Sequence, residues 1–260
     1  MSNSRPHPST FAPRLRQGAH LRGTFVKTPT SHATEMLGAM GFDFVVFDME
    51  HAPIDLGALD VMLLAARAAN VAGVVRVAEG TPAAILSVLD AGASGILVPH
   101  VDSAEKAATI VAASRYAGGK RGFANTTRAG GYGAAGFRDH MAAQDESVAV
   151  VAMIEDLAAV DRLDAILAVD GLDAVFIGRG DLTAALGEDA MTSEATRAVT
   201  EQIMAGVRRA AKPAILLCAD RADLEDMAGL GATAFMVGSD HAFMTKAARD
   251  ALAIMTPPVR

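Results

Sequence analysis

The sequence predicts a single (β/α)8 barrel, and three observations support this fold class. Short apolar runs recur along the chain, and each is followed by a segment with helical periodicity. Eight such strand-helix units fit into the 260 residues, and α/β barrels routinely form one domain of about 250 residues. The predicted strands are apolar throughout, which is typical of parallel strands buried on both faces.

The predicted strands and helices alternate without interruption by a linker. The strands lie at residues 21–26, 44–48, 74–77, 95–99, 148–155, 174–178, 213–217 and 234–238. A 3.6-residue periodicity of Ala, Leu, Val and Met predicts helices at 56–69, 82–91 and 104–115. Gly92 and Gly231 each precede a strand, where a glycine commonly ends the preceding helix.

The barrel domain is predicted to span residues 19–260, after a flexible tail at residues 1–18. The first 13 residues are rich in Ser, Pro and Thr and lack the apolar segment of a secretory signal. A frayed terminus is the interpretation we adopt for them. Cys218 is the single cysteine, which excludes an internal disulfide framework. Together these features predict a cytoplasmic protein.

Charge and hydropathy exclude several classes of partner. The net charge of −7 and the pI near 5.5 argue against binding to nucleic acid or to an anionic membrane. The mean hydropathy is +0.28, yet no run of roughly 18 apolar residues lacks charge or glycine, so no membrane span is predicted. Neither GxGxxG after the first strand nor GxxxxGK[ST] is present, so nucleotide binding is not indicated.

One segment departs from the strand-helix rhythm. Residues 117–136 contain seven glycines, too many for a stable helix. Long loops in compact domains are commonly functional. We expect this segment to cover the substrate; a passive insertion is the alternative.

Candidate functional residues lie where the predicted strands end, because barrel active sites form at that edge. Asp48, Glu50 and His51 follow the second strand, and Arg76 ends the third. A buried arginine needs an anionic partner, either a substrate oxygen or an internal salt bridge to Asp48 or Glu50. His51 beside a carboxylate is a candidate general base; a histidine hydrogen-bonded within a turn is the alternative.

Two further carboxylates, Glu155 and Asp181, follow adjacent predicted strands. The ends of adjacent strands lie about 5 Å apart, so these carboxylates repel each other unless a cation separates them. An oxygen donor set without Cys or His suits Mg2+ or Mn2+. Alternatively, each carboxylate only caps the following helix. Gly178 and Gly180 would let backbone N–H groups approach an anionic ligand.

Four segments together resemble one enzyme family. They are residues 47–53 (FDMEHAP), 75–77 (VRV), 154–155 (IE) and 178–182 (GRGDL). They are similar to the class II, metal-dependent pyruvate aldolases typified by 2,4-dihydroxyhept-2-ene-1,7-dioate aldolase. That family belongs to the superfamily that includes the citrate lyase β subunits. The resemblance extends over nearly the whole chain and implies a (β/α)8 barrel.

The resemblance implies a function and roles for these residues. The expected reaction is reversible cleavage of 4-hydroxy-2-oxo acids to pyruvate, or a related 2-oxo acid, and an aldehyde. Glu155 and Asp181 would hold Mg2+ or Mn2+, with Co2+ also possible. Arg76 would bind the enolate oxygen. His51, aided by Asp48, would act as acid and base through a water molecule.

The resemblance also implies substrate contacts and an assembly. Arg76, Gly178, Arg179, Gly180 and Met153 would line the substrate site. A proline commonly stands in the family at position 179 and a glutamine at position 153, so both residues are departures.

A homo-oligomer, trimeric or hexameric, would exchange the apolar C-terminal helix predicted at residues 242–255. In such an assembly, Asp90 would reach the site of a neighbouring subunit.

Three other functions stay open at this level. A Schiff-base aldolase needs a lysine at a strand end, and only Lys27 has that position. An acyl-CoA lyase of the malyl or citramalyl type needs a cationic groove, which only Arg121 and Arg128 offer. A non-catalytic barrel that binds oxo acids is the third, favoured by the unusual Arg179 and Met153.

Overall fold

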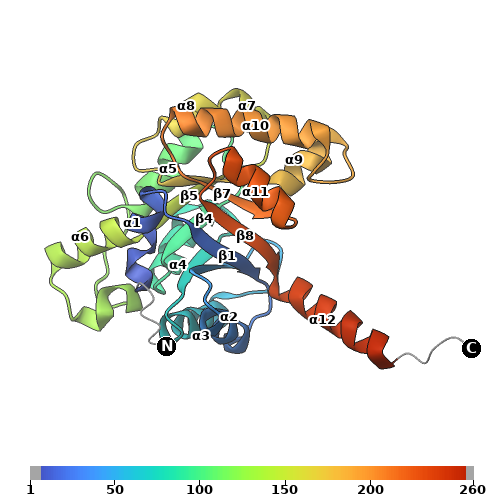
Figure 1. The fold of residues 1–260 in the computed structure, drawn as a ribbon. Coiled ribbons are helices and arrows are strands. Elements are labelled where there is room, and N and C mark those ends of the chain that lie inside the picture. The colour runs from blue at the N-terminus through green and yellow to red at the C-terminus, as the bar shows by residue number, and fades with distance from the viewer. Residues whose placement is uncertain (1–6, 256–260) are drawn as a thin grey trace, which may run out of the picture.

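The predicted barrel is confirmed by a computed structural model, which describes residues 7–255 (Figure 1). The strands form a closed barrel in chain order, and each pairs in parallel with its neighbours. Every strand overlaps the range that its apolar run predicts. The strands are β1 Leu21–Val26, β2 Phe44–Asp48, β3 Ala72–Arg76, β4 Gly95–Val98, β5 Ala149–Ile154, β6 Ala174–Ile177, β7 Ala214–Cys218 and β8 Ala234–Ser239.

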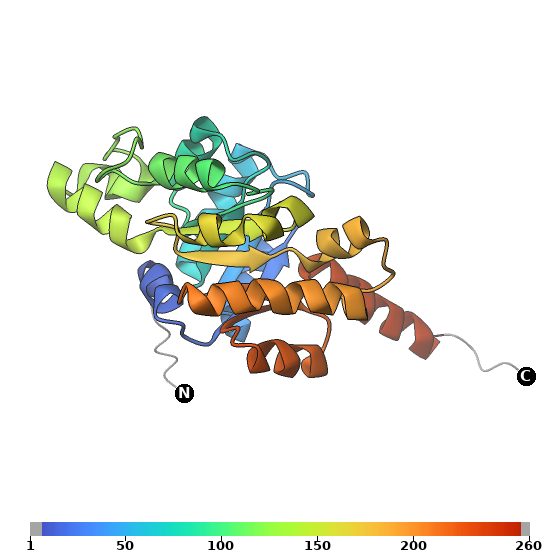
Figure 2. The same ribbon diagram turned by 90° about the horizontal axis from the view of Figure 1, so that it is seen from above.

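Helices surround the barrel and follow the strands along the chain (Figure 2). They are α2 Ser31–Met40, α3 Leu56–Ala68, α4 Pro82–Asp90, α5 Ala104–Ser114, α6 Phe137–Ser147, α7 Leu157–Asp161, α8 Leu163–Leu167, α9 Arg179–Leu186, α10 Glu194–Arg209, α11 Arg221–Gly229 and α12 Asp240–Met255.

Local capping chemistry sets many of these helix boundaries. Several helices begin at a side-chain oxygen that accepts a backbone N–H of the first turn, which defines the start. These caps are Thr30, Asp55, Thr81, Ser103, Ser193 and Asp220. Gly92 and Gly231 adopt φ values of +96° and +99°, as expected for glycines that follow a helix.

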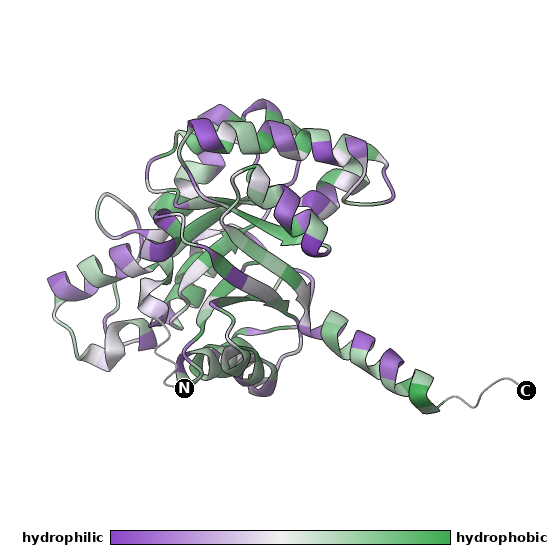
Figure 3. Cartoon of the chain, in the orientation of Figure 1, coloured by the Kyte–Doolittle hydropathy of each residue, from purple (hydrophilic) through white to green (hydrophobic). Residues whose placement is uncertain are grey.

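The strands bury side chains on both faces, which explains their continuous apolar runs. One face packs inside the barrel, where Phe25, Val46 and Phe176 belong to a single buried cluster. The other face packs against the helices, through residues such as Val45 and Ile96. Figure 3 shows the strands as mainly hydrophobic ribbons within the more polar helical layer.

The N-terminal segment differs from the flexible tail that the sequence predicts. Residues 8–16 form a short 3-10 turn, η1 Pro8–Thr10, and the helix α1 Phe11–Arg16. Phe11 and Leu15 are buried in the interior cluster, and the Phe11 ring lies 5.2 Å from the Phe44 ring. These side chains close the end of the barrel at which the strands begin. Residues 1–6 lie outside the described part of the chain.

The glycine-rich segment, residues 117–136, does not cover the mouth of its own barrel, which is the end at which the strands end. This differs from our expectation. It follows α5, so it lies toward the end of the barrel at which the strands begin. It contains the 3-10 turn η2 Arg128–Gly133, and Arg128 donates to the carbonyl oxygens of Asp60 and Ala91 at 3.0 Å. Arg121 pairs with Asp90 at the end of α4. These contacts hold the segment on the outside of α3 and α4.

The predicted apolar C-terminal helix is confirmed as α12, which projects away from the barrel in both views (Figures 1 and 2). It contacts β1 and β8 at its start. Beyond that point its apolar side chains are exposed, among them Met244, Leu252 and Ile254. Among the described residues, no helix combines the length and apolarity needed to cross a lipid bilayer.

We expect Phe11→Ala to lower the free energy of unfolding by about 3–5 kcal/mol, because it opens a cavity in the closed end of the barrel. Urea unfolding followed by circular dichroism measures this loss. Phe137→Ala is the matched control, since Phe137 is 65% exposed and its removal should change stability little. Equal stabilities of the two variants would show that α1 does not support the fold.

Candidate active site

A buried ion pair joins the ends of β2 and β3. Asp48 and Arg76 are opposite each other in the strand register. The Arg76 guanidinium donates from Nε to Asp48 Oδ1 at 2.9 Å and from Nη2 to Oδ2 at 2.7 Å. Burial alone would raise the pKa of Asp48, but Arg76 holds that pKa below its ordinary value. The internal salt bridge that the sequence left open therefore exists.

The same carboxylate organises the turn that follows β2. Asp48 Oδ1 also accepts the backbone N–H groups of Glu50 and His51, at 3.2 and 3.1 Å. The carboxylate beside the His51 ring is Glu50, whose Oε2 lies 3.7 Å from Nε2. Glu50 Oε2 also lies 3.3 Å from Nη1 of Arg76. Asp48 thus positions the His51 backbone, and Glu50 links its ring to Arg76.

The structure brings Glu155 and Asp181 together at the ends of β5 and β6. Burial and the nearby Asp181 carboxylate raise the pKa of Glu155 to about 7, although the His100 N–H opposes the shift. Gly178 lets the turn after β6 pack closely against Glu155. Any larger residue at this position would clash, because its Cβ atom would lie 2.5 Å from the Glu155 Cβ. Two carboxylates held this closely gain from a cation between them.

His100 is a site residue for which the sequence indicated no role. Its backbone N–H donates to Glu155 Oε1 at 2.7 Å, and its ring Nδ1 lies 3.1 Å from Asp156 Oδ2. Partial burial would lower the pKa of His100, but Asp156, Glu155 and Glu50 together raise it. Its φ of +53° is unusual outside glycine, and such conformations cluster at functional sites. Its place directly after the fourth strand was the only sequence signal.

A cavity of about 300 Å3 lies at this mouth of the barrel. Arg76, Met153, Gly178 and Asp181 line it, together with Lys27, the lysine at the end of β1. A Cβ atom added at Gly180 would meet open space, so the backbone at this position faces the cavity. The expected substrate residues on β3, β5 and β6 therefore surround one cavity.

Arg179 lines the same cavity, yet its guanidinium is directed into the protein. Its Nη1 pairs with Asp223 Oδ2 at 2.8 Å, and its Nη2 donates to the Met191 carbonyl oxygen at 2.8 Å. Burial would raise the pKa of Asp223, but Arg179 holds it below the ordinary value. The side chain of Arg179 thus ties α9 to α11, and only its backbone is available for substrate.

Asp90 is not brought to the site of its own chain. It ends α4, and its Oδ1 pairs with Nη2 of Arg121 at 3.2 Å. Helix α4 runs back from the mouth of the barrel to the start of β4. Asp90 therefore lies at the closed end, and contact with an active site needs a second subunit.

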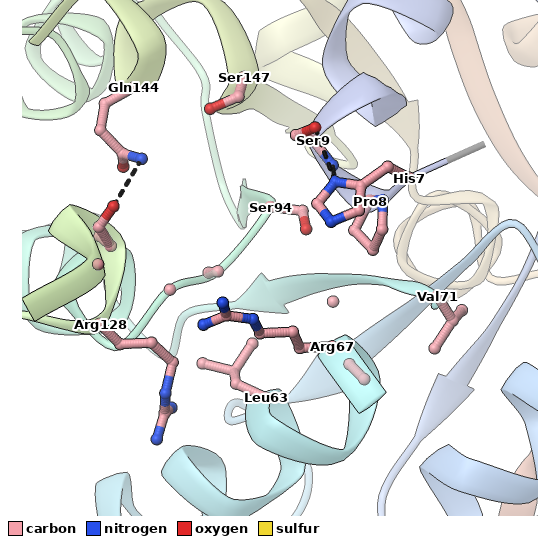
Figure 4. Close-up of a pocket in the computed structure, with 16 residues that line it drawn as sticks. His7, Pro8, Ser9, Leu63, Arg67, Val71, Ser94, Arg128, Gln144 and Ser147 are labelled. Atoms are coloured by element: carbon pink, nitrogen blue, oxygen red, sulfur yellow. Dashed lines mark hydrogen bonds between the residues drawn. The ribbon is translucent and has the colours of Figure 1, made fainter. Parts of the chain in front are cut away.

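A second cavity, of about 270 Å3, is unsuited to the predicted chemistry (Figure 4). It lies near the closed end, between α3, η2, α6 and the N-terminal segment. Arg67 and Arg128 extend toward it, and Gln144 bonds to the Ala129 carbonyl oxygen at its edge. No carboxylate lines it, so among the described residues it offers no oxygen ligands of the kind that Glu155 provides.

The donor set at the mouth fits a divalent metal bound partly by its substrate. Among residues 7–255, no group of three or more His, Cys, Asp or Glu side chains could hold a metal ion. Glu155 and Asp181 alone would supply two protein ligands. Mg2+ is commonly bound through one or two carboxylates, with substrate and water oxygens completing the shell.

We expect Arg179→Leu to lower the free energy of unfolding by about 3 kcal/mol, because Asp223 would stay buried without its cation. Chemical unfolding of the purified variant measures the change. Adding Asp223→Asn removes the unpaired charge and should recover much of the loss. An undiminished stability of the single variant would contradict a structural role for this ion pair.

The chain matches known proteins over nearly its whole length. It is 38% identical to a hydroxypyruvate/pyruvate aldolase of Roseovarius nubinhibens over 252 residues, covering 95% of this chain and 97% of the relative. It is 39% identical to a 5-keto-4-deoxy-D-glucarate aldolase of Klebsiella pneumoniae, covering 80% and 81% of the two chains.

Solved structures and family models agree with these relatives. The crystal structure of an HpcH/HpaI aldolase/citrate lyase family protein from Burkholderia cenocepacia superimposes with a TM-score of 0.89 and 28% identity, covering 95% of this chain and 99% of the other. The family model for HpcH/HpaI aldolase/citrate lyase matches residues 22–247. The chain therefore belongs to the HpcH/HpaI aldolase/citrate lyase family.

Proposed function

We propose that this aldolase is metal-dependent and reversibly cleaves 4-hydroxy-2-oxo acids to an aldehyde and pyruvate or hydroxypyruvate. The observation that carries the proposal is one cavity lined by Arg76 and by the Gly178 to Asp181 turn, against which Glu155 packs at Gly178. The names of the Roseovarius and Klebsiella relatives support 2-oxo acids as the substrate class.

Glu155 and Asp181 would hold the metal, as Mg2+, Mn2+ or Co2+. Bound there, the metal would supply Lewis-acid stabilisation of negative charge on the 2-oxo oxygen. His100 would keep Glu155 in place, since its backbone N–H occupies one carboxylate oxygen at 2.7 Å.

Arg76 and the start of α9 would bind the 2-oxo acid portion. Asp48 takes up Nε and Nη2 of Arg76, so the guanidinium is fixed while its remaining donors stay near the cavity. Helix α9 has no side-chain cap at Gly178, which leaves N–H groups of its first turn for a carboxylate. Arg76 would then stabilise the charge that develops on the enolate oxygen.

His51 is the proposed acid and base. Its side chain is 56% exposed at the mouth, and Glu50 lies beside its ring. Through water, His51 would accept the proton of the C4 hydroxyl as the C3–C4 bond breaks. The electron pair of that bond passes to the 2-oxo acid fragment as its enolate, and the aldehyde leaves. The proton held by His51 would then pass through water to C3 of the enolate, which completes pyruvate. In the reverse direction, His51 returns the proton to the new alkoxide.

The structure offers less support for the alternative functions. Lys27 Nζ forms an ion pair with Asp48 at 3.2 Å and its side chain is 27% exposed, so it is not the desolvated lysine that a Schiff-base mechanism uses. Arg121 is fully buried and pairs with Asp90, and Arg128 pairs with Asp60 at 2.8 Å. These two arginines therefore do not form a free cationic groove for the phosphates of coenzyme A.

The first experiment follows exchange of the pyruvate methyl protons in deuterated water by NMR, with Mg2+ or Mn2+ and with EDTA. We expect metal-dependent exchange by the parent enzyme and only the metal-free background from Glu155→Gln, which removes a ligand charge at constant shape. Glu225→Gln on exposed α11 is the matched control and should exchange normally. Metal-dependent exchange retained by Glu155→Gln would refute the ligand role.

We also propose a homo-oligomer, a trimer or hexamer, in which α12 packs on a neighbouring subunit. The exposed apolar side chains of α12 support this, because they have little contact with their own barrel. The same assembly would give Asp90 access to another subunit's site.

Multi-angle light scattering of the purified protein should give the mass of a trimer or hexamer. The double substitution Met244→Glu and Leu252→Glu should reduce that mass, because it places charges on the apolar face of α12. The exposed Lys246→Glu variant on the same helix is the control. A monomeric parent protein would exclude the proposed exchange.

A further inference from the structure

Lys27 places a second cation in the cavity. It follows β1, its side chain is 27% exposed, and it lines the space that Arg76 and Asp181 also line. Its Nζ lies 3.2 Å from Asp48 Oδ2. The proposed cleavage does not use this ammonium group.

Asp48 does not depend on Lys27 to satisfy its carboxylate. Four other donors reach Asp48: two from Arg76 and the backbone N–H groups of Glu50 and His51. An ammonium group has three donors, and within residues 7–255 Asp48 is the one carboxylate that forms an ion pair with Lys27 Nζ. Lys27 therefore has donors left for a ligand in the cavity.

The backbone that carries Lys27 is held firmly. The N–H groups of Lys27 and Thr28 each donate to the buried carboxylate of Asp240, both at 2.9 Å. Asp240 opens α12 and also accepts the N–H of His241 at 3.0 Å. This clamp fixes the direction in which the Lys27 side chain leaves β1, and a prepositioned donor is what a binding site requires.

The order of strands places Lys27 across the barrel from the carboxylate pair. Glu155 follows β5, and β1 is the strand opposite β5 in a closed ring of eight. A 2-oxo acid bound by Arg76 and the start of α9 leaves the part of the cavity beside β1 and β8 for the aldehyde portion. Lys27 and Ser239 line the cavity on that side.

We propose that Lys27 is a specificity-determining residue that binds a carboxylate on the aldehyde substrate. The inference rests on the proposed aldolase reaction and extends it to the acceptor. Arg76 gives Asp48 two hydrogen bonds, whereas Lys27 makes one ion-pair contact with it, which leaves two of the three ammonium donors for a ligand. An ammonium group acts as a compact point charge and favours an anionic oxygen over a neutral hydroxyl.

The test compares two aldehydes of equal carbon number with pyruvate as donor and Mg2+ or Mn2+ present. Glyoxylate carries a carboxylate, and glycolaldehyde carries an uncharged hydroxymethyl group. In Lys27→Met, kcat/KM for glyoxylate should fall about 10- to 100-fold more than for glycolaldehyde, mainly through KM. Lys27→Arg, which keeps the charge, should retain more of the glyoxylate preference.

Two controls separate this inference from the proposed function. Lys120→Met, in the exposed glycine-rich segment, should keep the parent ratio of the two acceptors. Lys27→Met should still exchange the methyl protons of pyruvate measurably, which shows that it folds and binds the donor. Equal losses for both acceptors, or exchange abolished in Lys27→Met alone, would overturn the inference. Absence of exchange by the parent enzyme would overturn the proposed function and the inference with it.

Discussion

The buried pair of Asp48 and Arg76 is the interaction on which the site depends. A buried guanidinium at the carboxyl end of β3 would destabilise the barrel by several kcal/mol without an anionic partner. Asp48 provides that partner from the adjacent position of β2, and its other bonds fix the turn that carries Glu50 and His51. One carboxylate therefore sets the positions of Arg76, the proposed oxyanion donor, and of His51, the proposed proton carrier.

The opposite side of the mouth has the reverse electrostatic problem. Glu155 and Asp181 bring like charges together, and burial together with the Asp181 carboxylate raises the pKa of Glu155. Gly178 and the His100 N–H hold the arrangement despite the repulsion between the two carboxylates. A divalent cation would relieve the repulsion, so the geometry is one that favours metal binding. Arg76 and Asp181 thus line one small cavity, and Glu155 lies next to Asp181.

The two ends of the barrel have different roles because they are filled differently. Phe11 and Leu15 close the end where the strands begin, and packing there stabilises the fold. Polar side chains gather at the other end, where a 300 Å3 cavity stays open. The glycine-rich segment lies near the closed end of its own barrel. It can therefore reach an active-site end only in an assembly, where that end belongs to a neighbouring subunit.

The sequence by itself determined the barrel and most of the candidate residues. Buried parallel strands leave long apolar runs, and caps such as Thr81 and Asp55 are local signals, so strands and helices were predictable. Polar residues that end those runs identified Asp48, Arg76, Glu155 and Asp181, and the family resemblance supplied their roles.

Only the tertiary structure decided where long side chains point and which segments pack. Arg179 turns toward Asp223, 44 residues away, and no local pattern encodes that choice. His100 was missed because its partners, Glu155 and Asp156, follow a different strand. Helix α1 was missed because its apolar face packs only once the barrel interior exists. Periodicity and capping act within a few residues, whereas these contacts exist only once the barrel has closed.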